Sequence, residues 1–228
     1  MCGIAGSFIR QEAFKLYEGN LERGRYSAGL LTSTPIINLQ IQNITEVIKR
    51  QSPFTLDDVP ERKQLYLFHG RAPTSRTTEY DPIDTHPFCV NGVCVAHNGI
   101  ITNHDKLGEK YEINYSLPNV SMVDSYVIPF MINHNKQHCD NWVDAIIETL
   151  NELDGIFALW IHIAETGKTF ICRSGSTLYA DFNTGAFSSS PVFGFSSVPE
   201  GQLYTVDINA GLYAVKSFKT KHTYFIAP

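Results

Sequence analysis

The chain has 228 residues, of which 43% are hydrophobic, 12% aromatic and 18% charged. This content is enough for one packed domain and excludes a disordered chain, which lacks the apolar groups that offset the entropy of ordering. The net charge of −5, without a basic run, argues against nucleic acid as a partner. No apolar stretch approaches the roughly 20 residues that cross a membrane as a helix, so we expect no membrane association.

The sequence has five cysteines: Cys2, Cys89, Cys94, Cys139 and Cys172. The first residues have neither the basic nor the long apolar region of an export signal. We therefore expect free thiols in a cytoplasmic protein, where the environment is reducing. Cys89 and Cys94 are neighbours, but no second pair of ligands follows at zinc spacing, so we expect no metal.

The first half of the chain contains one predicted helix and several strand signals. The helix covers 11–21, and the apolar run Leu65–Phe68 is typical of a strand. Two further apolar runs, His86–Val90 and Val93–His97, flank Asn91-Gly92. Because Asn and Gly tolerate positive φ angles, this pair predicts a type I′ hairpin turn.

Two more helices are predicted in the second half. One covers 121–133, with Ser121 and Asp124 spaced like a capping box, although an interior proline such as Pro129 costs a helix about 3 kcal/mol. The other follows Asp140-Asn141, because apolar residues recur every three or four positions until Gly155.

Paired strands are predicted over 155–170, turning near Thr166-Gly167, and over 204–218, turning at 209–211. Helices and mainly antiparallel strands together indicate an α+β fold. The long apolar strands favour sheets that are covered on both faces.

Cys2 is the first candidate catalytic residue. If Met1 is removed, as the small size of residue 2 permits, Cys2 carries a thiol and a free α-amine. An α-amine titrates near 7.7–8.0, so it can take the proton of the thiol directly or through one water. A cysteine near a chain end can also be merely buried or frayed. Gly3 and Gly6, however, favour a strand that a ligand or another backbone can approach closely.

Several short segments then follow in a recognisable order. They are Arg23–Gly29 (Arg-Gly-Arg-Tyr-Ser-Ala-Gly), His69–Thr74, His86–Phe88, Ala96–Asn103, Val123–Ser125 and Arg173–Leu178. Together with the opening Met-Cys-Gly-Ile, they resemble the motifs of the class II glutamine amidotransferases, which are N-terminal nucleophile (Ntn) hydrolases. The resemblance runs over nearly the whole chain. It implies a four-layer αββα sandwich of two mainly antiparallel sheets, with 1–228 as a single glutaminase domain.

The resemblance also implies a mechanism. Cys2 would attack the side-chain amide of glutamine, release ammonia and leave a γ-glutamyl thioester that water cleaves. The Asn98 side chain and the Gly99 N–H would stabilise the oxyanion, and such donors each lower a barrier by about 3–4 kcal/mol. By itself, an Asn-Gly pair is more typical of a turn than of an oxyanion site. Arg23 would order the nucleophile and the oxyanion region.

The remaining candidates would bind the zwitterionic head of glutamine. Arg71 can bind the α-carboxylate through two parallel hydrogen bonds, with Thr74 as a further partner. Asp124 can accept from the α-ammonium, and it can also cap the predicted helix. His86 and His97 lie in the family's pocket region and are candidate substrate contacts, although a lone histidine is often structural. We expect no cofactor.

Three positions depart from the family pattern. Tyr26 stands where Asp is usual, Ala72 where a large aromatic residue is usual, and Arg76 where a glycine often closes the glutamine loop. Two alternatives therefore stay open: an Ntn amidase that acts on another γ-glutamyl or acyl amide, and a catalytically silent binding scaffold. The pair of Arg71 and Asp124 favours glutamine, because a substrate that is not a zwitterion would leave one charge unpaired.

Family members usually carry a second domain that consumes the ammonia. This sequence ends about where a glutaminase domain ends, and it shows no phosphate-binding loop. We therefore expect either a separate synthetase subunit as ammonia acceptor or a free-standing glutaminase.

Overall fold

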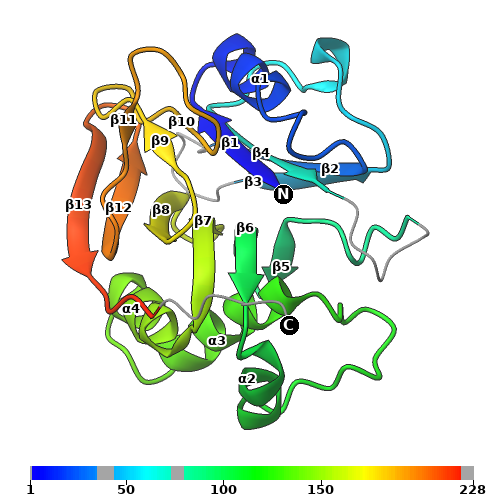
Figure 1. Cartoon of the computed structure of the whole chain (residues 1–228), viewed down its shortest axis with the longest axis vertical. Coiled ribbons are helices and arrows are strands. Elements are labelled where there is room, and N and C mark those ends of the chain that lie inside the picture. Colours follow the sequence, from blue (N-terminus) through cyan, green and yellow to red (C-terminus); the bar gives the residue numbers. More distant parts are fainter. Residues whose placement is uncertain (1, 35–43, 73–79, 222–228) are drawn as a thin grey trace, which may run out of the picture.

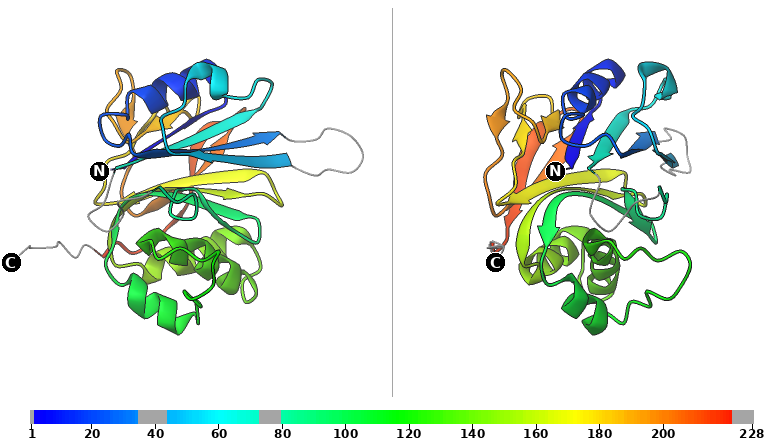
Figure 2. Two further views of the ribbon diagram at one scale, coloured as in Figure 1. Left: turned by 90° about the vertical axis from the view of Figure 1, so that its right-hand side faces the viewer. Right: turned by 45° about the vertical axis from the view of Figure 1, so that its right-hand side comes forward.

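The computed structural model describes residues 2–34, 44–72 and 80–221. Two antiparallel sheets pack face to face (Figure 1). Figure 2 shows α1 (Arg10–Glu18) over one outer face, and α2 (His104–Lys110), α3 (Val127–Lys136) and α4 (Trp142–Glu152) over the other. The predicted αββα sandwich is therefore confirmed. Within the described ranges, none of the helices combines the length and the apolar character needed to cross a membrane.

The first sheet has seven strands. Their spatial order is β11 (Ser196–Ser197), β9 (Tyr179–Ala180), β10 (Phe187–Ser188), β1 (Gly3–Ser7), β4 (Leu65–Arg71), β2 (Ser27–Thr34) and β3 (Ile44–Arg50). Gly3 in β1 pairs with Gly70 in β4. This register brings Cys2, which directly precedes β1, to the end of β4 where Arg71 lies.

The second sheet has six strands. Their order is β13 (Gly211–Ser217), β12 (Gln202–Asp207), β8 (Lys168–Ser174), β7 (Gly155–Ile163), β6 (Val93–Ile101) and β5 (Phe88–Val90). All three predicted hairpins, β5–β6, β7–β8 and β12–β13, are present. The φ angles of 44° at Asn91 and 80° at Gly92 agree with the predicted turn.

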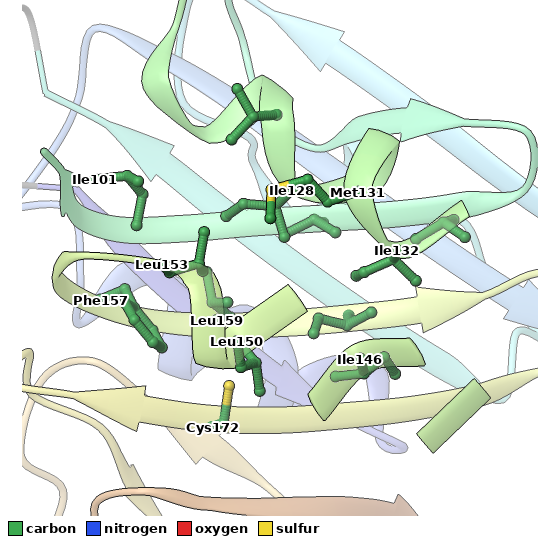
Figure 3. Packing of buried hydrophobic residues seen from close by; sticks show 14 of the residues in the cluster. Ile101, Ile128, Met131, Ile132, Ile146, Leu150, Leu153, Phe157, Leu159 and Cys172 are labelled. Carbon is green, nitrogen blue, oxygen red and sulfur yellow. The ribbon is translucent and has the colours of Figure 1, made fainter. Parts of the chain in front are cut away.

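Three apolar clusters fill the three interfaces between the four layers. Ile4 and Trp160 belong to the cluster between the sheets, and Phe14 and Tyr17 belong to the cluster under α1. The third cluster joins the second sheet to α3 and α4 (Figure 3). Trp160 also donates its indole N–H to the Phe68 carbonyl at 3.2 Å, which links the two sheets by a buried hydrogen bond.

The helix expected over 121–133 begins later than predicted. Asp124–Tyr126 forms a 3₁₀ turn, η2, and α3 follows directly. Ser121 is no helix cap, because its hydroxyl accepts from Val123 N–H and donates to Asp84. Pro129 is the third residue of α3, in the first turn, where backbone N–H groups lack helical partners, so the expected conflict does not arise.

The other two predicted helices are present. Asn141 caps α4 by accepting from Asp144 N–H at 3.0 Å. Helix α1 ends at Glu18, earlier than predicted, and Gly19 to Arg23 continue in turns. A second 3₁₀ turn, η1, covers Leu56–Asp58.

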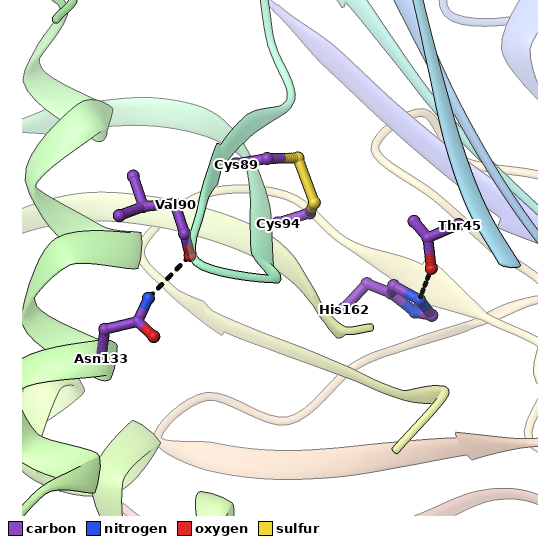
Figure 4. Close-up of a disulfide and its surroundings, with 6 residues drawn as sticks. All are labelled: Thr45, Cys89, Val90, Cys94, Asn133 and His162. Carbon is purple, nitrogen blue, oxygen red and sulfur yellow. Dashed lines mark hydrogen bonds between the residues drawn. A yellow bond between two sulfur atoms is a disulfide. The ribbon is translucent and has the colours of Figure 1, made fainter. Parts of the chain in front are cut away.

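The prediction of free thiols is wrong for one pair. Cys89 and Cys94 lie directly opposite each other in the β5–β6 hairpin, with Cα atoms 4.1 Å apart, and form a disulfide (Figure 4). The two-residue turn at Asn91-Gly92 produces this pairing. Sequence reasoning considered this pair only as metal ligands and expected free thiols from the reducing compartment, so it missed the pairing that the hairpin produces.

The disulfide makes a direct prediction for thiol counting. Alkylation of the unfolded, unreduced chain should modify three cysteines, Cys2, Cys139 and Cys172. Reduction before alkylation should raise the number to five. Peptide mass spectrometry distinguishes the states, and the matched control is a Cys89→Ser, Cys94→Ser double variant, which should show three modified cysteines under both conditions. Five modified cysteines without reduction would contradict the disulfide.

Candidate active site

The backbone of Cys2 is held by two of the predicted catalytic residues. Its carbonyl oxygen accepts from Arg23 Nε at 3.0 Å. In the amide orientation that gives both of its polar atoms partners, Asn98 donates to the same oxygen at 2.8 Å and accepts from Arg23 Nη2 at 3.3 Å. Because an amide NH₂ carries two N–H groups, this contact uses only one of them. Asn98 lies in the second sheet and Cys2 directly precedes the first, so this hydrogen bond connects the two sheets at Cys2.

Burial raises the pKa of the Cys2 thiol above its usual value. A hydrogen bond from the Ala72 backbone N–H and the positive charge of Arg71 oppose this shift without cancelling it. Thiolate is therefore scarce at neutral pH. A nucleophilic role for this sulfur requires a base that removes its proton during the reaction.

Two glycines are required by the geometry around Cys2. Gly99 has a φ of 146°, and a Cβ there would lie 2.0 Å from the Ile156 carbonyl oxygen. A Cβ on Gly24 would lie 2.5 Å from the carbonyl carbon of Arg71. Glycine at 99 permits the strained backbone of β6, and glycine at 24 lets the segment after Arg23 lie against the end of β4.

Arg71 and Asp124 bring opposite charges to the nucleophile from different layers. Arg71 ends β4 and is only 3% exposed, whereas Asp124 begins η2 and its side chain is 21% exposed. Both act on Cys2: the positive charge lowers the pKa of the thiol and the carboxylate raises it. The structure therefore brings together Cys2, Arg71 and Asp124. Thr74, the other predicted carboxylate partner, lies outside the described residues.

Three histidines lie buried beside this group. The rings of His69 and His86 are 4.1 Å apart, and His86 also lies 4.4 Å from Phe88. Burial lowers the pKa of His69 to about 3, and burial also lowers the pKa values of His86 and His97, so all three are neutral at pH 7. Among the described residues, no three His, Cys, Asp or Glu side chains form a group that could hold a metal.

Sequence reasoning did not select the residues that fix β1. Asn20, which is 1% exposed, donates to Ser188 Oγ at 2.9 Å. Ser189 Oγ accepts from Ile4 N–H at 3.1 Å. Gly3 is needed here, because a Cβ would lie 2.7 Å from the Cβ of Asn20. Asn20 and the two serines stand in no recognisable sequence pattern, so nothing in the sequence marked them.

The model of one protein family, described as "Glutamine amidotransferase domain", matches residues 77–192, about half of the chain. The chain belongs to the glutamine amidotransferase family. The class predicted from the motifs is thereby confirmed, and glutamine is the substrate of this family. The match includes Asn98, Gly99 and Asp124, but not Cys2, Arg23 or Arg71.

Curated relatives extend the similarity over more of the amidotransferase domain. Glutamine–fructose-6-phosphate aminotransferase (isomerizing) of Pseudomonas putida is 29% identical over 81% of the chain and 31% of the relative. The enzyme of the same name from Legionella pneumophila strain Lens is 25% identical over 96% of the chain and 37% of the relative. The chain thus spans about a third of the length of these relatives.

Solved structures share the Ntn-hydrolase fold. The glutamine phosphoribosylpyrophosphate amidotransferase of B. subtilis superposes with a TM-score of 0.73 at 18% identity, over 97% of the chain and 50% of that protein. A glutamine aminotransferase class-II domain protein from Silicibacter pomeroyi gives a TM-score of 0.55 at 11% identity, over 96% of the chain and 99% of that protein.

Proposed function

We propose that this amidotransferase domain hydrolyses the side-chain amide of glutamine through a Cys2 thioester and supplies ammonia to an acceptor on a separate protein. The observation that carries the proposal is the set of groups around Cys2. Arg23 and Asn98 hold its backbone, while Arg71 and Asp124 place opposite charges near its sulfur.

The first step forms the thioester. Once Met1 is removed, the α-amine of Cys2 takes the thiol proton, and the sulfur attacks the amide carbon of glutamine. The resulting C–O⁻ re-forms the carbonyl as the C–N bond breaks, and the ammonium returns the proton to the departing nitrogen, which leaves as NH₃. The raised pKa of the thiol supports this order of events, because the sulfur alone supplies little thiolate.

The second step returns the free enzyme. The same amine takes a proton from water, whose oxygen attacks the thioester carbon. The C–S bond then breaks to release glutamate, and the ammonium returns the proton to the sulfur, which restores the Cys2 thiol and the free amine. In both steps negative charge develops on the former amide oxygen. The Asn98 NH₂ and the Gly99 N–H are the proposed donors to this oxygen, where each is worth about 3–4 kcal/mol.

Arg71 and Asp124 are the proposed partners of the α-carboxylate and the α-ammonium. A buried guanidinium has the planar geometry for two parallel hydrogen bonds to a carboxylate. Thr74 stays a proposed further partner. His86 stays a proposed substrate contact, and His97, whose Nδ1 lies 2.7 Å from Ser125 Oγ, has a partner within the protein.

The acceptor, the extent of the domain and the location belong to the same proposal. The names of the curated relatives give fructose 6-phosphate as their acceptor, and this acceptor is stated for those relatives alone. We propose residues 1–228 as one glutaminase domain. A cytoplasmic location also stays a prediction, although the Cys89–Cys94 disulfide removes part of the cysteine argument for it.

Labelling with a diazo-ketone analogue of glutamine tests the function. The purified protein should gain one covalent adduct, mapped to a peptide that begins at Cys2, and glutamine should protect against labelling. A Cys2→Ala variant is the control and should gain none. Hydrolysis of N-acylated glutamine faster than glutamine would instead favour the other amidase, and a processed chain that is neither labelled nor active would favour the silent scaffold.

A further inference from the structure

Asp124 is held by a short chain of buried groups behind the proposed substrate site. One carboxylate oxygen, Oδ2, accepts from the Ile101 backbone N–H at 2.7 Å. The other, Oδ1, accepts from the Ser125 hydroxyl at 3.0 Å. Ser125 Oγ in turn lies 2.7 Å from Nδ1 of His97, and both residues are buried, with 0% and 2% exposure.

The available N–H and O–H groups decide which of Asp124, Ser125 and His97 donates in each hydrogen bond. Ser125 has a single O–H, and a carboxylate can only accept, so the hydroxyl hydrogen goes to Asp124. His97 must therefore donate its Nδ1–H to Ser125 Oγ. Burial lowers the pKa of His97, and the Asp124 carboxylate and the Ile156 backbone oppose this shift without cancelling it, so the ring is neutral at pH 7.

We propose that Ser125 and His97 are positioning residues that select the α-ammonium group of glutamine by fixing the Asp124 carboxylate. The inference rests on the proposed function and assigns the amine specificity to two residues that do not touch the substrate. Each donor that points at a carboxylate oxygen limits the rotation of the carboxylate. A carboxylate that is already fixed loses less conformational entropy when the ammonium binds.

The arrangement also accounts for the place of His97 in the site. Its ring lies under Gly99, where Nε2 is 2.9 Å from the position that a Cβ would occupy. The bond of Nδ1 to Ser125 gives this ring a role that needs no contact with glutamine. The same ring thus connects the strand of Asn98 and Gly99 with the 3₁₀ turn of Asp124.

The test compares two ligands that differ only in the α-amine. Glutamine and 4-carbamoylbutanoate, which is glutamine without its α-amine, are titrated into the full chain carrying Cys2→Ala, so that no thioester forms. Addition of Ser125→Ala should weaken glutamine binding about tenfold, as expected for loss of a hydrogen bond to a charged group, and should change binding of the analogue less than about twofold.

Matched variants separate positioning from packing. Ser125→Thr keeps the hydroxyl and should restore most of the glutamine affinity. His97→Asn keeps an N–H near the position of Nδ1, so it should bind glutamine more tightly than His97→Leu. The inference is overturned if Ser125→Ala weakens both ligands equally, if it weakens neither, or if glutamine itself does not bind. Normal amine selectivity without any hydrolysis in the chain that retains Cys2 would overturn the proposed function alone.

Discussion

Glutamine hydrolysis should fall by a factor on the order of 10⁴ or more when Cys2 is replaced by alanine, because no other group in the site can form the thioester. Glutamine should still bind, since Arg71 and Asp124 are unchanged. The measurement is ammonia release at saturating glutamine, with calorimetric binding as the test that the site is intact.

An N-terminal extension provides the sharper version of this experiment. A short peptide fused before Cys2 converts its α-amine to an amide, which cannot take a proton, so activity should be lost although the thiol remains. The matched control carries the same peptide at the other end of the chain. In the active form, kcat should rise with pH through the pKa of the amine, near 7.7–8.0, because only the neutral amine acts as a base. Full activity of the extended chain would contradict the proposed base.

Elements with strong local signals were predictable from sequence. The Asn91-Gly92 hairpin needs only two residues that tolerate positive φ, and α4 has both an Asn cap and a regular apolar face. Strand β2 was read only as part of a motif, because its partners lie far along the chain: Ala28 pairs with Gly70 and with Arg50. Helix α2 has seven residues and no side-chain cap, so it carries little periodicity.

Some residues of the site could also be predicted from the sequence, and others could not. Arg23, Asn98 and Arg71 were selected because they sit in motifs, and the structure adds how the first two reach the backbone of Cys2. Ser189 bonds to Ile4 of β1 and Asn20 bonds to Ser188 of β10, in both cases between segments more than 160 residues apart, and such pairing leaves no trace in one sequence. The roles of Asn20 and Ser189 could therefore not be predicted from the sequence.

Arg71→Lys is expected to have the second largest effect. Lysine keeps the positive charge but loses the planar pair of donors, and the shorter reach of a single ammonium leaves part of the α-carboxylate unpaired. Because Arg71 is only 3% exposed, this should cost about 2–3 kcal/mol, which is roughly 30- to 150-fold in kcat/KM for glutamine. Steady-state kinetics should place most of the loss in KM, because the carboxylate is bound equally in the ground state and the transition state.

The control for Arg71→Lys is a change in the substrate. Glutamine α-amide has no carboxylate, so it should be a poor substrate of both forms, with kcat/KM differing by less than about threefold between them. Asp124→Asn should show the opposite pattern, with a large loss for glutamine and for its α-amide, since both retain the α-ammonium. If Arg71→Lys reduced the two substrates by the same factor, the guanidinium would support the fold of the site rather than bind the carboxylate. The glutamine head would then need another cation, and the charge pattern around Cys2 would no longer favour a free amino acid over other amides.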